Sequence, residues 1–125
     1  MLIDSSILID HLRGQLQAKT FLLSVRASGG LHTSAVVAAE VLIGARDLRE
    51  QREVDRLLAD FRIEHIEPAD CALSLDLLRR HRLSSGVGWL DCLIAATAMR
   101  LNVPVATLNE RHFAAIAGLT VNRPY

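Results

Sequence analysis

Residues 86–107, GVGWLDCLIAATAMRLNVPVAT, decide the predicted fold of this chain. Glycines at 86 and 88 mark a loop, and a helix is predicted from Leu90 to Leu101. Val103–Thr107 follows at once as a short apolar strand. A helix that leads directly into a buried strand is typical of β–α–β units, in which neighbouring strands run parallel.

The same alternation extends over the rest of the chain. Strands are predicted at Met1–Asp4, Leu31–Thr33 and Ile63–Ile66, with an edge strand at Thr120–Val121. Helices are predicted between them, from Ser5 or Ser6 as the cap to Gly14 and then over 18–26, 35–46, 50–61, 68–82 and 111–117. We therefore expect one domain over residues 1–125, a three-layer α/β/α sandwich with a short-stranded parallel sheet.

Composition narrows the classes of function. Half of the 125 residues are hydrophobic, which excludes a disordered chain. Fourteen basic and fourteen acidic residues balance, so a nucleic-acid binder acting by bulk positive charge is excluded. No apolar run is long enough to span a bilayer, and no secretory segment is recognised. Cys71 and Cys92 show no disulfide pattern and are expected to be buried thiols of a cytoplasmic protein.

Three acidic residues stand alone in otherwise uncharged segments. Asp4 is the only charged residue in 1–9, Glu40 in 31–45, and Asp91 in 84–99. Burying a carboxylate costs several kcal/mol unless it is paired, hydrogen-bonded or bound to a metal. Because these segments contain no Lys or Arg, the pattern points to a shared metal site.

The predicted positions of these acids converge. Asp4 ends the first strand, Asp91 begins a helix, and Asn109 follows the strand that ends at Thr107. Ligands of open parallel sheets gather at the carboxyl ends of the strands. Oxygen ligands without His or Cys suit Mg²⁺ or Mn²⁺ better than Zn²⁺.

Each acid taken alone also has a structural interpretation. Asp4 could cap the following helix, Glu40 could bond a backbone turn, and Asp91 could favour a helix start. The other polar residues are interpreted as structural. Arg79–Arg82 form a solvated helix end, and Trp89 is a packing anchor. His11, His32, His65 and His112 show no metal-ligand spacing and are expected on the surface or behind the direct ligands of a site.

Four segments, taken together, resemble the PIN domain family. MLIDSSILIDHLRG (1–14) is similar to its opening strand and helix, and TSAVVAAEVLIGA (33–45) to its second acidic motif. Residues 86–107 resemble the third motif, and LNERHFAAIAGLTVNRPY (108–125) the closing section. The resemblance covers the whole chain, and the small size is similar to VapC-type toxins of toxin–antitoxin pairs.

The resemblance implies a metal-dependent ribonuclease, a homodimer inhibited by a cognate antitoxin. Asp4, Glu40 and Asp91 take the acidic positions, and Asn109 the fourth, where many PIN domains have Asp. A neutral amide offers an oxygen without charge, which disfavours a second ion. Ser5 and Thr107 match the hydroxyl positions beside the acids. The expected chemistry is phosphodiester hydrolysis of RNA with Mg²⁺ or Mn²⁺.

Two alternatives have different functions. A phospho-accepting receiver domain shares the architecture but requires a lysine near its last strand, and the only lysine here is Lys19. A PIN-like module that only binds RNA or protein is favoured by Asn109 and disfavoured by the three acids. For the homodimer, we expect contacts from helices within 18–61, through an apolar face formed by Val54, Leu57, Leu58 and Phe61.

Overall fold

The computed structural model describes all residues from 1 to 125. The strands are β1 (Leu2–Ile3), β2 (Leu31–Ser34), β3 (Phe61–Glu64), β4 (Val105–Ala106) and β5 (Val121–Asn122). The helices are α1 (Ser5–Leu12), α2 (Leu16–Gly29), α3 (Ala35–Ile43), α4 (Leu48–Leu58), α5 (Pro68–Ser85), α6 (Trp89–Leu101) and α7 (Glu110–Phe113). None of these helices combines the length and the hydropathy that crossing a membrane requires.

Parallel pairing brings the two ends of the chain together. β1 pairs with β4, with Leu2 opposite Val105, and β5 pairs with the other side of β4. β2 and β3 form a second parallel ladder. The Thr33 hydroxyl of β2 donates to the Ile3 carbonyl of β1 at 2.6 Å, so the ladders lie side by side. The strands thus form two parallel sheets, β1-β4-β5 and β2-β3, which meet at β1 and β2.

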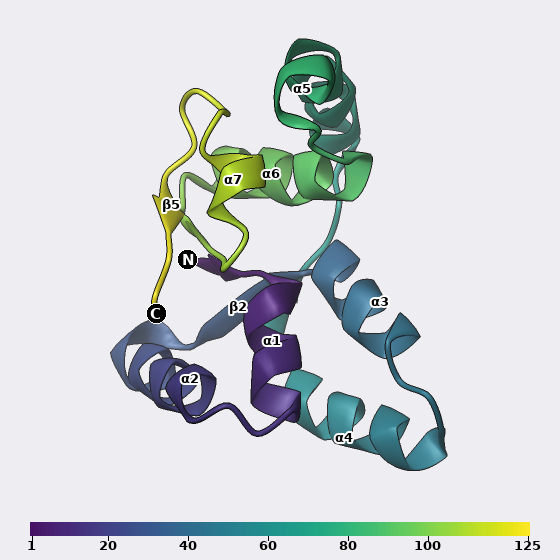
Figure 1. Ribbon diagram of the computed structural model, residues 1–125, viewed down its shortest axis with the longest axis vertical. Helices are drawn as coiled ribbons and strands as arrows, with labels where there is room; N and C mark the ends of the chain where they lie inside the picture. Colours follow the sequence, from purple (N-terminus) through teal and green to yellow (C-terminus); the bar gives the residue numbers. More distant parts are fainter.

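Helices cover both sides of these strands, which confirms the predicted α/β/α layers. Figure 1 shows α5, α6 and α7 on one side and α1, α2 and α4 on the other. The segment from Cys92 to Ala98 of α6 is buried throughout, as expected for a helix that is apolar on all faces. The quoted stretch 86–107 thus supplies the central helix and one central strand.

Several predicted boundaries are wrong by a few residues. The helix predicted at 50–61 is α4, and it begins earlier because the Asp47 side chain accepts a hydrogen bond from the Glu50 amide at 2.8 Å. The helix predicted at 111–117 is the short α7, and the edge strand is Val121–Asn122. Cys71 is exposed on α5, contrary to the prediction that both thiols are buried.

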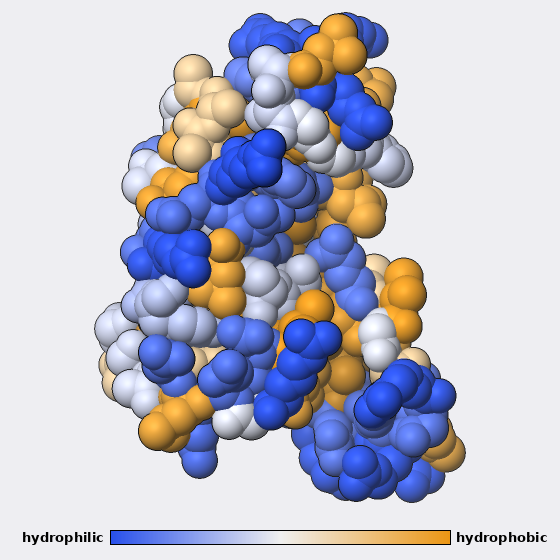
Figure 2. Space-filling model, viewed as in Figure 1, coloured by the Kyte–Doolittle hydropathy of each residue, from blue (hydrophilic) through white to orange (hydrophobic).

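The apolar face expected to form a dimer interface is part of the core instead. Val54 is 3% and Phe61 8% exposed, and Leu57 and Leu58 are partly buried against the same cluster. The outward side of α4 is hydrophilic, as Figure 2 shows. The face therefore covers this domain's own sheet, and it gives no support to the expected homodimer contact.

A buried ion pair joins α5 to α6, the helix that carries Asp91. Arg100 donates to both carboxylate oxygens of Asp70, from Nε at 2.8 Å and from Nη2 at 3.0 Å. Asp70 also accepts from the Glu67 amide at 2.9 Å and from the Thr97 hydroxyl at 3.3 Å. Burial raises the pKa of Asp70, but these hydrogen bonds outweigh it and hold the pKa below its ordinary value.

We expect Asp70→Ala to destabilise the fold by about 2 kcal/mol, because Arg100 loses its buried partner and keeps only Glu67 at 3.3 Å and the His65 carbonyl at 3.2 Å. The value is below the range for fully buried pairs because Arg100 keeps 23% of its side chain exposed. The control is Asp76→Ala, which breaks the more exposed Asp76–Arg80 pair and should cost less than about 1 kcal/mol. Urea unfolding of both variants measures the difference, and equal losses would contradict the prediction.

Acid should remove the advantage of the wild type over Asp70→Ala. The pKa of Asp70 is lower in the folded chain, so the unfolded chain takes up its proton first as the pH falls. The contribution of the pair is therefore complete above the ordinary aspartate pKa of about 3.9 and is lost below it. Unfolding curves between pH 7 and pH 3 follow this convergence.

Candidate active site

The candidate site lies where β1 and β4 end. Asp4 follows β1 directly, and Thr107 follows β4. The Thr107 hydroxyl donates to Asp4 Oδ2 at 2.6 Å, and the Ser6 hydroxyl donates to the same oxygen at 2.9 Å. Asp4 occupies the cap position of α1, but its side chain makes no capping hydrogen bond. The structural interpretation of this carboxylate as a helix cap is therefore wrong.

The two hydroxyls also fix the loop that follows β4. Ser6 Oγ accepts from the Leu108 amide at 3.1 Å, and Thr107 Oγ1 accepts from the Asn109 amide at 2.9 Å. Of the two predicted hydroxyl residues, Thr107 lies beside Asp4, whereas Ser5 contacts Glu40. Ser6, which the sequence analysis did not single out for the site, takes the second place beside Asp4.

Glu40 reaches the same region from α3. Burial raises its pKa, a hydrogen bond from the Ser5 side chain lowers it, and the negative charges of Asp4 and Asp91 raise it again. The net direction is upward. Its Oε2 atom is buried and has no hydrogen-bond partner. A buried carboxylate oxygen without a partner is costly, and a bound cation would remove that cost.

Asp91 lies in the first turn of α6, as predicted. Burial raises its pKa, the contact with His112 lowers it, and the charge of Asp4 raises it, with a net upward direction. Asp4, Glu40 and Asp91 therefore act on one another electrostatically. None of the three forms an ion pair with Lys or Arg.

His112 is the residue of this site that sequence reasoning missed. Its Nδ1 atom lies 2.9 Å from Asp91 Oδ2 and 2.8 Å from the side-chain nitrogen of Asn109. Because no second histidine stands at ligand spacing, the sequence predicts His112 only at the surface or behind the direct ligands. The signal was its separation of three residues from Asn109, which places both side chains on one face of a helix.

The chemistry of these side chains suits a divalent cation, but the side chains are not gathered around one point. Mutual repulsion of three carboxylates, together with the unpartnered Glu40 oxygen, favours a positive charge between them. No three Asp, Glu, His or Cys side chains are close enough together to share one ion. The closest contacts among potential ligands join Asp91, His112 and Asn109, while Asp4 is held by its two hydroxyls.

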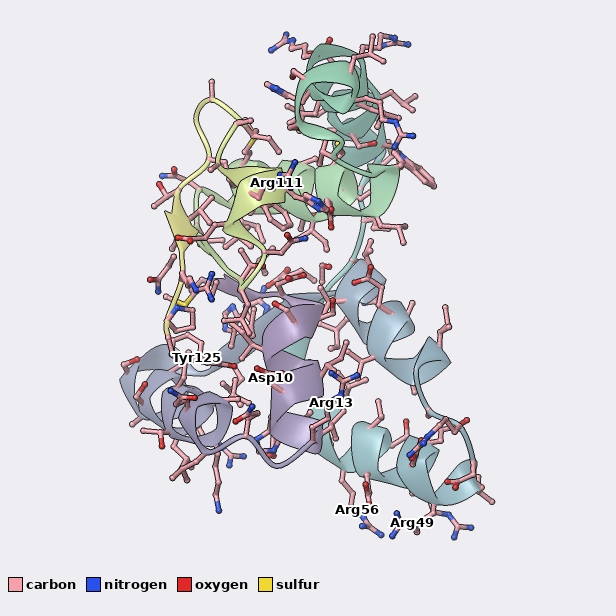
Figure 3. All side chains as sticks on the ribbon, in the orientation of Figure 1. Asp10, Arg13, Arg49, Arg56, Arg111 and Tyr125 are labelled. Carbon is pink, nitrogen blue, oxygen red and sulfur yellow. The ribbon has the colours of Figure 1, made fainter.

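A separate groove of about 550 Å³ opens between α1, α3 and α4, and none of the three acids lines it. Its apolar lining is Ile9, Leu12, Val41, Ala45 and Val54, and its charged rim is Arg13, Arg46, Arg49, Glu50 and Glu53. Arg13 lies at the end of α1 and Arg49 on α4 (Figure 3). The groove is therefore built on the helices that follow Asp4 and carry Glu40.

Comparison with known proteins places the chain in a family. The PIN domain model matches residues 1–119. Ribonuclease VapC10 of Mycobacterium tuberculosis is 45% identical over 114 residues, which cover 90% of this chain and 85% of that protein. A toxin–antitoxin complex from Klebsiella pneumoniae contains a chain that superposes with a TM-score of 0.80 at 30% identity, over 99% of this chain and 97% of that one.

A DNA-bound VapBC structure from Salmonella typhimurium matches over the full length of both chains, with a TM-score of 0.82 and 20% identity, and shows the same fold. The family model over residues 1–119 and the shared fold define the class of protein. The chain belongs to the PIN domain family. Within that family it is of the VapC type.

We expect Glu40→Gln to raise the Tm of the metal-free protein at pH 7 by roughly 2–4 °C. The pKa of Glu40 is higher in the folded chain, so its contribution to stability is complete below the ordinary glutamate pKa of about 4.3 and is lost as the pH rises. The ionised wild type thus carries a penalty at pH 7 that the variant lacks.

The two melting curves should converge below about pH 3.5, where Glu40 is largely protonated in both states. Glu110→Gln is the control, because Glu110 is exposed on the neighbouring α7 and should leave the Tm unchanged. Calorimetry with EDTA measures all three proteins. A Glu40→Gln variant that matches the wild type at every pH would contradict the electrostatic interpretation.

Proposed function

We propose that this chain is a metal-dependent endoribonuclease that acts as the toxin of a toxin–antitoxin pair. The observation that carries the proposal is the convergence of Asp4, Glu40 and Asp91 without any Lys or Arg partner. Such an arrangement is unfavourable in the empty protein and becomes favourable with a divalent cation. The name of the relative that is 45% identical, Ribonuclease VapC10, supports RNA as the substrate.

Each side chain of the site has a separate role in the proposed hydrolysis of RNA. Asp4 and Asp91 hold Mg²⁺ or Mn²⁺, with Asn109 beside them. When bound, the cation supplies charge neutralisation for the phosphodiester and lowers the pKa of a bound water. Glu40, whose pKa is raised, completes the binding set or accepts the proton of the attacking water as general base. Thr107 and Ser6 hold the Asp4 carboxylate in one orientation.

The accessible part of the site suits single-stranded or looped RNA. Asp91 and His112 keep 22% and 34% of their side chains exposed, so a flexible phosphodiester can reach them from solvent. A regular duplex presents its phosphates on a rigid surface and is a poorer fit to a site recessed at the ends of strands. The alternative of a binding module without catalysis has only Asn109 in its favour.

An antitoxin partner is the second part of the proposal. The solved relatives described above include toxin–antitoxin complexes. The groove between α1, α3 and α4 offers an apolar lining with charges of both signs at its rim, which suits an amphipathic protein segment. Val41, the residue that follows Glu40 on α3, belongs to its lining. We place the protein in the cytoplasm, and the homodimer rests on the family resemblance alone.

Replacing either central acid should abolish cleavage. We expect Asp4→Asn and Asp91→Asn to lose at least about a thousandfold in rate on single-stranded RNA with Mg²⁺ or Mn²⁺. The rise in Tm on adding the ion should also disappear. Asp10→Asn is the control: Asp10 lies on α1, the helix that Asp4 precedes, but it accepts from the Tyr125 hydroxyl at 3.3 Å, and Figure 3 shows these two side chains facing each other.

Wild-type cleavage by Asp91→Asn, or cleavage that continues in EDTA, would refute the proposed metal nuclease. Retention of RNA binding by the wild type in EDTA without any cleavage under any metal would instead favour the binding module.

The antitoxin should inhibit by placing a basic side chain against the acids. A carboxylate cluster without its ion attracts Arg, which can bridge two carboxylates with several donors. We expect replacement of that arginine by Ala in the partner to preserve the complex and restore cleavage. Co-purification and an RNA cleavage assay measure the two effects, and a structure in which the bound partner stays away from Asp4 and Asp91 would contradict this route.

A further inference from the structure

His112 is placed so that a single nitrogen serves two neighbours. Its Nδ1 atom contacts Asp91 Oδ2 at 2.9 Å and the Asn109 side-chain nitrogen at 2.8 Å. The imidazole keeps 34% of its side chain exposed and Asp91 22%, so the contact is open to solvent and to a small ion.

With the Asn109 side-chain nitrogen facing Nδ1, hydrogen atoms cannot satisfy both contacts. A protonated Nδ1 donates to Asp91 but then faces the amide hydrogens of Asn109. An unprotonated Nδ1 accepts from Asn109, and its contact with the Asp91 carboxylate then lacks a hydrogen. Turning the Asn109 amide over brings its oxygen to the ring nitrogen: a protonated Nδ1 then donates to both oxygens, whereas an unprotonated Nδ1 and the two oxygens all present lone pairs. These three atoms would then all be potential metal ligands.

The spacing of the contacts also suits a shared ion. Neighbouring ligands of an octahedral ion bound at about 2.1 Å lie about 3 Å apart. The observed 2.9 Å and 2.8 Å are close to that value. The second observation is the buried and unpartnered Oε2 of Glu40, which is electrostatically coupled to Asp91.

Holding α7 in place does not require His112. Phe113, the next residue, is fully buried in the core, and the Asn109 amide donates to Thr107 Oγ1 at 2.9 Å. The short helix is thus anchored on both sides of the histidine. The contact of His112 with Asp91 is free to serve the site rather than the fold.

We propose that His112 is a ligand of the divalent cation through Nδ1, together with Asp91 and the side-chain oxygen of Asn109, and that it makes this site prefer Mn²⁺ to Mg²⁺. Imidazole nitrogen suits transition metals, whereas Mg²⁺ strongly favours oxygen. The inference rests on the proposed function for the presence of an ion, and it adds a nitrogen ligand to the all-oxygen set expected from the sequence.

Pulsed EPR of the Mn²⁺-loaded chain tests the ligand directly. The wild type should show coupling of the manganese to a ¹⁴N nucleus, and His112→Ala should lose it. In calorimetric titrations the wild type should bind Mn²⁺ at least about tenfold more tightly than Mg²⁺. His112→Ala should lose about tenfold in Mn²⁺ affinity, and His112→Asp should bind both ions with similar affinity and no ¹⁴N coupling.

His65→Ala is the matched control, because His65 is exposed and its side chain makes no hydrogen bond, so Mn²⁺ binding should be unchanged. Wild-type Mn²⁺ binding without ¹⁴N coupling, with His112→Ala equally tight, would overturn the inference and leave the proposed nuclease standing. Failure of the wild type to bind either ion would overturn the proposed metal centre itself, and this inference with it.

Discussion

The repulsion among three carboxylates that have no Lys or Arg partner is the interaction that the rest of the structure must accommodate. Asp4, Glu40 and Asp91 come from β1, α3 and α6, and each is partly or largely buried. Placing them together costs free energy that the rest of the domain must offset. A fold tolerates such a cluster when the cluster gains a ligand that binds only the folded state.

The domain handles its two sets of buried acids in opposite ways. Asp70 is satisfied by Arg100, Thr97 and a backbone amide, so its pKa falls and it stabilises the packing of α5 on α6. Asp91, on the same helix as Arg100, keeps a raised pKa and an incomplete set of partners. The C-terminal end of α6 is thus held by the Arg100–Asp70 ion pair. Its N-terminal end presents the Asp91 carboxylate, which is free to bind a cation.

The parallel pairing of β1 with β4 positions the side chains of the candidate site. The register that sets Ile3 opposite Ala106 puts the next residues, Asp4 and Thr107, side by side at the strand ends. The Thr107 and Ser6 hydroxyls then orient Asp4 and hold the loop that leads to α7. That loop carries Asn109 and His112 to Asp91. Asp4 and Thr107, about a hundred positions apart, thus meet because two strands of two residues each pair with one another.

The sequence by itself determined the alternation of strands and helices and the identity of the three acids. Both depend on local pattern: apolar periodicity predicts an element, and a lone charge in an apolar segment marks an exception. Tertiary structure alone decided what covers each face. The apolar side of α4 looks the same whether it meets a second subunit or its own sheet, and here Val54 and Phe61 are core.

The choice of Ser6 over Ser5 beside Asp4 depends on the direction in which α1 leaves β1. The approach of His112 to Asp91 depends on how α7 packs through Phe113. Side-chain contacts between distant segments are set by packing, and no pattern within one segment contains them.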